Sequence, residues 1–180
     1  MRLANLMAAA AAVALMTPAV SAAFGTNVTM TCRPLNYLLK YSPIEHCSVI
    51  VWHWSEDAVP KKTIDAQFST PGWSRRPTNK TNDPTFVQDR AAFFNPGGRN
   101  SNYEVAVPDG MTADDFADAV KRGGGGTVCP FYFPVGPNSN TVAAAIVADA
   151  GGTPPHVPYA LGAKVSACRR HTRESPGHSH

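Results

Sequence analysis

The stretch Gly136-Pro-Asn-Ser-Asn-Thr-Val-Ala-Ala-Ala-Ile-Val-Ala-Asp-Ala-Gly151 predicts a helix whose two ends are both marked in the sequence. A Gly-Pro turn precedes it, Asn138 or Ser139 can cap its first turn, and Gly151 can close it. The free N–H groups of that first turn suit an oxyanion or another anion. Small residues at helical spacing predict a face that packs closely on a sheet: Ala143, Ile146, Val147 and Ala150.

The strongest strand pattern is Ile44–Trp54, because this segment is rich in β-branched and aromatic residues. Side chains alternate along a strand, so we expect two distinct faces. One face carries His46, Ser48, Ile50, Trp52 and Trp54, and the other carries Cys47, Val49, Val51 and His53.

The remaining elements are short and separated by turn residues, with a long loop region over 70–102. We expect no repeated strand–helix–strand units, and therefore an α+β fold in which a small antiparallel sheet packs against the Ala-rich helix. In chain order, the expected elements are strand Phe24–Met30, strand Lys62–Phe68, a weak element over Thr85–Phe94, strand Tyr103–Val107, and a helix capped by Thr112 with Asp115 reaching back. Val128–Val135 is expected to be either an edge strand or an extended approach to the Gly136 turn.

The first residues have the pattern of an export signal. Arg2 gives a positive start, Leu6–Met16 is an apolar run, and small residues suited to a signal peptidase end at Ala22. The run is too short to cross a bilayer, and we expect no integral membrane span elsewhere. We therefore expect residues 1–22 to be a signal peptide, 24–168 a single domain and 169–180 a disordered tail of an exported protein, periplasmic or secreted.

Charge and cysteine content narrow the class further. The chain carries 16 Lys and Arg against 13 Asp and Glu, which is not the basic footprint of a nucleic-acid binder. An even number of cysteines in an exported chain predicts two disulfides, with three possible pairings. Their spacing fits neither a zinc site nor a redox motif, so no metal or other cofactor is expected. The candidates are Cys32, Cys47, Cys129 and Cys168, and pairing them in that order closes the shorter loops.

A histidine on a strand and a hydroxyl at a helix start are the chemical groups of interest. In one interpretation Ser139 is a nucleophile, His46 is its general base, and N–H groups near Asn140 bind an oxyanion. Asn138 and Trp52 would then contact the substrate. Each residue also has a structural interpretation: Ser139 as a helix cap, His46 as a buried sheet histidine and Trp52 as core. No partner that would orient His46 is evident; the candidates are Glu45, Asn95 and Tyr103.

Three sequence features occur in an order that resembles a known family. His46 opens the strand His-Cys-Ser-Val-Ile-Val-Trp, Gly-Pro-Asn-Ser-Asn-Thr-Val-Ala-Ala follows much later, and Ala-Gly-Gly-Thr-Pro-Pro comes directly after it. This order, over Ile44–Gly162, resembles the circularly permuted NlpC/P60-like, papain-like domains. It is most similar to the branch with this helix start in secreted and polymorphic-toxin-associated bacterial proteins. The chain departs from that family at Ser139, where the family has its nucleophilic cysteine.

The resemblance implies a papain-like fold and two alternative functions. The first is an exported hydrolase or acyltransferase acting on an amide or ester, with a cell-wall peptide as the favoured substrate and a lipid or acyl substrate as another. The second is a catalytically inactive binding or toxin-associated module of the same fold, which the serine at the nucleophile position motivates. Neither alternative predicts the oligomeric state.

Overall fold

The computed structural model describes residues 25–35, 44–55, 61–71, 74–131, 133, 137–158, 160–162 and 168–170. The expected signal peptide at residues 1–22 and residues 171–180 of the expected tail lie outside these ranges. None of the helices in the described ranges has the length of apolar sequence that a bilayer crossing requires.

A four-stranded antiparallel sheet forms the centre of the fold, in the order β3-β2-β1-β4. The predicted strands Ile44–Trp54 and Lys62–Phe68 are confirmed as β2 and β3, which pair antiparallel. On the other side of β2, the register with β1 places Cys32 opposite Cys47 and Arg33 opposite His46. The strands are β1 (Gly25–Pro34), β2 (Glu45–Ser55), β3 (Lys61–Phe68) and β4 (Ser101–Glu104).

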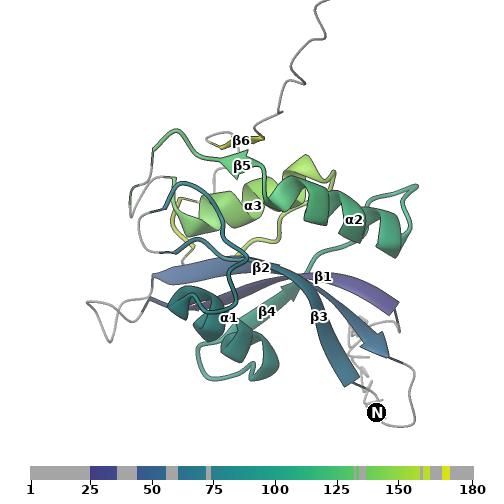
Figure 1. The fold of residues 1–180 in the computed structure, drawn as a ribbon, viewed down its shortest axis with the longest axis horizontal. Coiled ribbons are helices and arrows are strands. Elements are labelled where there is room, and N and C mark those ends of the chain that lie inside the picture. The colour runs from purple at the N-terminus through teal and green to yellow at the C-terminus, as the bar shows by residue number, and fades with distance from the viewer. Residues whose placement is uncertain are drawn as a thin grey trace, which may run out of the picture.

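The three helices of the described ranges cover the sheet from both sides (Figure 1). Helices α2 and α3 lie together over one face, and α1 lies under the other. The helices are α1 (Pro84–Phe94), α2 (Ala113–Gly124) and α3 (Ser139–Asp149). The expected α+β class is therefore confirmed, with the Ala-rich helix packed against an antiparallel sheet.

The predicted alternation of β2 side chains between the two faces of the sheet is confirmed. The residues of each face pack into a different apolar cluster. Cys47, Val49 and Val51 belong to the large cluster under α2 and α3. Ile50 and Trp52 pack on the opposite face, against Phe93 of α1. This division of β2 side chains between the two helical layers decides which residues can meet at a site.

The predicted cap of α2 is confirmed, and the structure decides between the two candidates for the cap of α3. Thr112 caps α2, and its hydroxyl accepts a hydrogen bond from Asp115 N at 3.1 Å. Of the two candidates at the start of α3, the cap is Asn138, and Ser139 is the first helical residue. Gly151 follows the end of α3 with φ +91°, a conformation that glycine adopts without steric cost.

The sequence prediction of a single buried face on α3 is too narrow. Every residue from Ser139 to Val147 is buried. The sheet covers one side of the helix, α2 lies beside it, and β5 (Thr127–Val128) contacts it from above (Figure 1). A helix that is apolar or small all round is typical of a central position between layers.

One short pair of strands involves the segment after α2 and the start of the expected tail. Of the described residues in the range 128–135, Val128 lies in a strand, β5, which pairs with β6 (Arg169–Arg170) inside the expected tail. The Cys129–Cys168 disulfide lies directly beside this pair and holds its two segments together. Pro130 ends β5, since proline has no N–H to donate to a partner strand.

Both disulfides follow the shorter-loop pairing. Cys32–Cys47 closes a separation of 15 residues across β1 and β2, and Cys129–Cys168 closes one of 39 residues. Two buried disulfides suit an oxidising compartment.

Candidate functional site

The start of α3 is joined to the sheet by the side chain of Asn140. Its Oδ1 accepts a hydrogen bond from Cys47 N at 2.9 Å, and its Nδ2 donates to Glu45 O at 2.9 Å. Nδ2 also lies 3.3 Å from Leu161 O, in the segment after the helix. The Asn140 amide therefore bonds to backbone groups of two other segments and holds three parts of the chain together.

The neighbouring polar side chains have similar structural roles. Asn138 caps the helix and also donates from Nδ2 to Leu161 O at 2.7 Å. The Thr141 hydroxyl accepts from Asn138 N at 3.1 Å and donates to Gly162 O. These reciprocal bonds form a capping box, so they satisfy N–H groups that a helix start would otherwise leave free.

Ser139 is 2% exposed and sits in the first turn of α3. Its hydroxyl lies 3.5 Å from Asn140 Oδ1, a long contact. The Asn140 N–H, which the catalytic interpretation offers to an oxyanion, donates instead to Asn138 Oδ1 at 2.9 Å. The chemistry expected at the helix start therefore has neither solvent access nor a free donor at Asn140.

His46 lies on the opposite side of the sheet, in a buried ionic cluster. Its Nε2 is 3.0 Å from Asp89 Oδ2, and Arg33 Nε donates to Asp89 Oδ1 at 2.6 Å. The side chains of His46 and Asp89 are 5% and 1% exposed, and that of Arg33 is 11% exposed. Arg33 and His46 are neighbours across β1 and β2, and Asp89 comes from α1, so the cluster ties α1 to the sheet.

The electrostatics of Asp89 favour its ionised form. Burial raises the pKa of this carboxyl, but three partners outweigh that effect and hold the pKa below its usual value. In order of effect they are His46, through its charge and hydrogen bond, the charge of Arg33, and a hydrogen bond with Ser69.

Asp89 is the site residue that the sequence interpretation missed. The candidates for orienting His46 were Glu45, Asn95 and Tyr103, and the partner is none of them. A signal was present: Phe86, Asp89 and Phe93 lie three and four residues apart, so Asp89 falls on the apolar face of its helix. A carboxylate at such a position needs a buried partner.

The structure places the two members of the predicted pair, Ser139 and His46, on different faces of the sheet. Neighbouring residues on a strand point to opposite faces, and Cys47 lies on the face that α3 covers. His46 consequently points to the α1 face and bonds to Asp89, whereas Ser139 lies with α3 on the other face (Figure 1). The sheet separates the expected base from the expected nucleophile.

The two residues predicted to contact a substrate, Asn138 and Trp52, are both buried. Trp52 is 2% exposed and packs edge-on against Trp54, while its Nε1 donates to Thr29 Oγ1 at 2.8 Å. Asn138 is 5% exposed and has its side chain committed to the cap and to Leu161. Both residues are structural, and neither presents a surface to a ligand.

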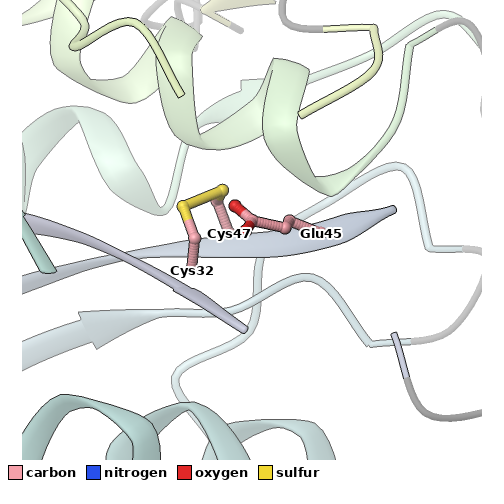
Figure 2. A group of neighbouring side chains, drawn as sticks. All are labelled: Cys32, Glu45 and Cys47. Atoms are coloured by element: carbon pink, nitrogen blue, oxygen red, sulfur yellow. A yellow bond between two sulfur atoms is a disulfide. The ribbon is translucent and has the colours of Figure 1, made fainter. Parts of the chain in front are cut away.

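One group of side chains has the proximity of a metal site. Figure 2 shows the Glu45 carboxylate beside Cys32 and Cys47, and the potential donor atoms all lie within 4.8 Å of one another. The two sulfur atoms are bonded to each other in a disulfide, so neither is the thiolate that binds zinc. Burial raises the pKa of Glu45, with the charge of Arg99 opposing it, and Glu45 Oε2 has no hydrogen-bond partner in the described part of the chain.

Comparisons of the chain with protein-family models, with curated proteins and with solved structures return no match.

Proposed function

We propose that this chain is an exported binding module that does not use the start of α3 for catalysis. The observation that carries the proposal is the commitment of the helix-start side chains to structural bonds. Asn140 holds two backbone segments, Asn138 and Thr141 form the capping box, and Ser139 is buried. The histidine that would activate Ser139 bonds to Asp89 on the other side of the sheet.

The proposed kinship is with the permuted NlpC/P60-like, papain-like domains, in a form that has lost catalysis. The order of a strand histidine followed by a Gly-Pro-Asn-Ser-Asn-Thr helix start supports it, as does the packing of α3 on an antiparallel sheet. The leader pattern and the two disulfides support export. The ligand implied by this kinship is a cell-wall peptide or an acylated lipid.

A fluorophosphonate probe tests the proposal, because it labels serines that a neighbouring base activates. We expect the purified chain to remain unlabelled under conditions in which a known serine hydrolase is fully labelled. Mass spectrometry of the digested chain identifies any modified residue. Covalent labelling of Ser139 that disappears on denaturation would overturn the proposal.

A hydrolase or acyltransferase is the second candidate function, favoured by the hydrogen bond between His46 and Asp89. A carboxylate that fixes an imidazole is the arrangement that orients a general base. Ser48 lies two residues along the same strand face and is as fully buried as Ser139, but its Oγ has no hydrogen-bond partner among the described residues. Probe labelling that Ser48→Ala removes and Ser139→Ala leaves intact would favour this second candidate.

A further inference from the structure

An open groove lies between the end of α1 and the β2–β3 hairpin. It encloses about 500 Å³, within the usual range of ligand sites. Its walls include Trp54, Lys61, Lys62 and Ile64 from the hairpin and Arg90 and Phe94 from α1. Arg90 and Phe94 put this groove on the α1 face of the sheet, whereas α3 lies over the opposite face.

Positive charge dominates the groove. Three of its lining residues are cationic, Lys61, Lys62 and Arg90, and none of the lining residues in the described ranges is acidic. Lys61 and Arg90 are exposed. The chain as a whole is close to neutral, so this concentration of one sign is local and would attract an anionic ligand.

Aromatic rings hold two of these cations in place. Lys62 Nζ lies 4.7 Å from the centroid of the Trp52 ring and 5.4 Å from that of Trp54. The Arg90 guanidinium carbon lies 5.7 Å from the Phe94 ring centroid. A cationic side chain that already rests on a ring face has a restricted position. It therefore loses less conformational entropy when a ligand binds than a freely moving side chain would. Phe94 is itself 42% exposed and offers an apolar surface beside the charges.

The groove also adjoins an edge of the sheet. Strand β3 is the last strand on its side of the sheet, and Ser69, directly after it, forms an isolated bridge with Thr78. The half that starts at Lys61 is the part that borders the groove. An edge strand presents N–H and C=O groups that an extended peptide can pair with.

We infer that this groove binds an extended acidic segment of a partner protein, with acidic residues on the cations and an apolar side chain against Phe94. The inference rests on the proposed binding role and names the partner of the module. An open groove beside an edge strand suits a peptide, and the three cations among its described lining residues favour a negatively charged one.

Peptide binding measured by fluorescence anisotropy tests the inference. The probes are short labelled peptides of alternating glutamate and phenylalanine, glutamate and alanine, and lysine and phenylalanine. We expect the full chain to bind the first and to bind each of the others at least about tenfold more weakly, which corresponds to about 1.4 kcal/mol. Vesicles of phosphatidylglycerol serve as an anionic surface without a peptide.

Matched variants locate the site. Arg90→Glu and Phe94→Ala should each weaken binding of the glutamate–phenylalanine peptide roughly tenfold. Arg122→Glu, which makes the same charge change on α2, and Phe131→Ala, which removes an exposed ring outside the groove, should leave it unchanged. Thermal unfolding of each variant shows that it is folded.

Three results would overturn the inference: no binding of the acidic aromatic peptide, equal loss in the groove and control variants, or binding to the vesicles alone. None of them bears on the labelling of Ser139, so a failure here is separable from a failure of the proposed function.

Discussion

The Asn140 side chain makes hydrogen bonds to the backbone of Cys47 and Glu45 in β2 and of Leu161 after α3. Replacement by alanine would leave the Cys47 N–H buried without a partner, and such a loss costs the full desolvation of the group. We predict that Asn140→Ala lowers the free energy of unfolding by roughly 2–4 kcal/mol. Urea unfolding measures this change.

Asn95 provides the matched control for that variant. It is exposed, and its side chain bonds only to the carbonyl of Ala91 in its own helix among the interactions described. Asn95→Ala should change the free energy of unfolding by less than about 0.5 kcal/mol. Equal effects of the two variants would mean that Asn140 does not join α3 to the sheet.

Asp89 gives the protein a specific sensitivity to acid. Its pKa is lower in the folded chain than its ordinary value of 3.8, so the carboxylate stabilises the fold above about pH 4. That stabilisation is lost as pH falls through the folded pKa, because the unfolded chain then binds the proton more readily. We predict that stability falls below about pH 4 in the wild type and falls less steeply in Asp89→Asn.

The same variant should be weaker at neutral pH, where it leaves Arg33 without its buried partner. The expected loss is roughly 3–5 kcal/mol, typical of breaking a buried ion pair. Asp118→Asn is the control, since Asp118 is exposed and paired only at the surface with Lys121. A parallel pH profile for wild type and Asp89→Asn would contradict the assignment.

Individual side chains were the hardest part to predict from the sequence. The two faces of β2 were predictable from alternation alone, but the sequence does not say which helix covers which face. The catalytic interpretation requires His46 to lie on the face that α3 covers. In the structure, Cys47 lies on that face instead. The partner of His46 was recognisable in principle, because Asp89 is the charged residue on the apolar face of α1.

At the scale of elements, α3 is a helix whose small side chains allow close packing between layers. Ala145 is fully buried among them. Ala145→Leu would add volume where neighbouring layers leave no space, so we predict a loss of about 1–3 kcal/mol in the free energy of unfolding. Ala148→Leu, on the less buried side of α3, should cost much less. Equal tolerance of leucine at both positions would contradict the close packing.

Elements with strong local signals were predictable, and those that depend on distant contacts were not. The cap at Thr112 and the closing glycine at Gly151 are local chemistry and were identified, and the cap of α3 was narrowed to Asn138 or Ser139. Strand β6 forms because a disulfide holds its segment against β5, and nothing in the sequence of Arg169–Arg170 indicates a strand.

For the whole molecule, the two disulfides link segments that differ in how they are otherwise held. Cys32 and Cys47 face each other within the long pairing of β1 with β2. Cys129–Cys168 instead lies beside β5 and β6, which are paired over two residues each. From loop length alone, removing them should cost roughly 3 and 4 kcal/mol respectively. Double alanine variants and urea unfolding measure both.

Amide hydrogen exchange separates the local from the global effect of these variants. Loss of Cys129–Cys168 should speed exchange at β5 and β6 while the amides of β1 and β2 keep their relative protection. Uniform acceleration across the sheet would show that this disulfide does not act locally.

Which helix covers which face of the sheet determines the surroundings of His46 and Ser139. The position of the His46 ring therefore tests this arrangement most directly. Nuclear Overhauser effects from the His46 ring protons measure that position directly in solution. We predict contacts with the β-protons of Asp89 in α1 and none with Ser139. Contacts between the His46 ring and the β-protons of Ser139 would place base and nucleophile together and contradict the account.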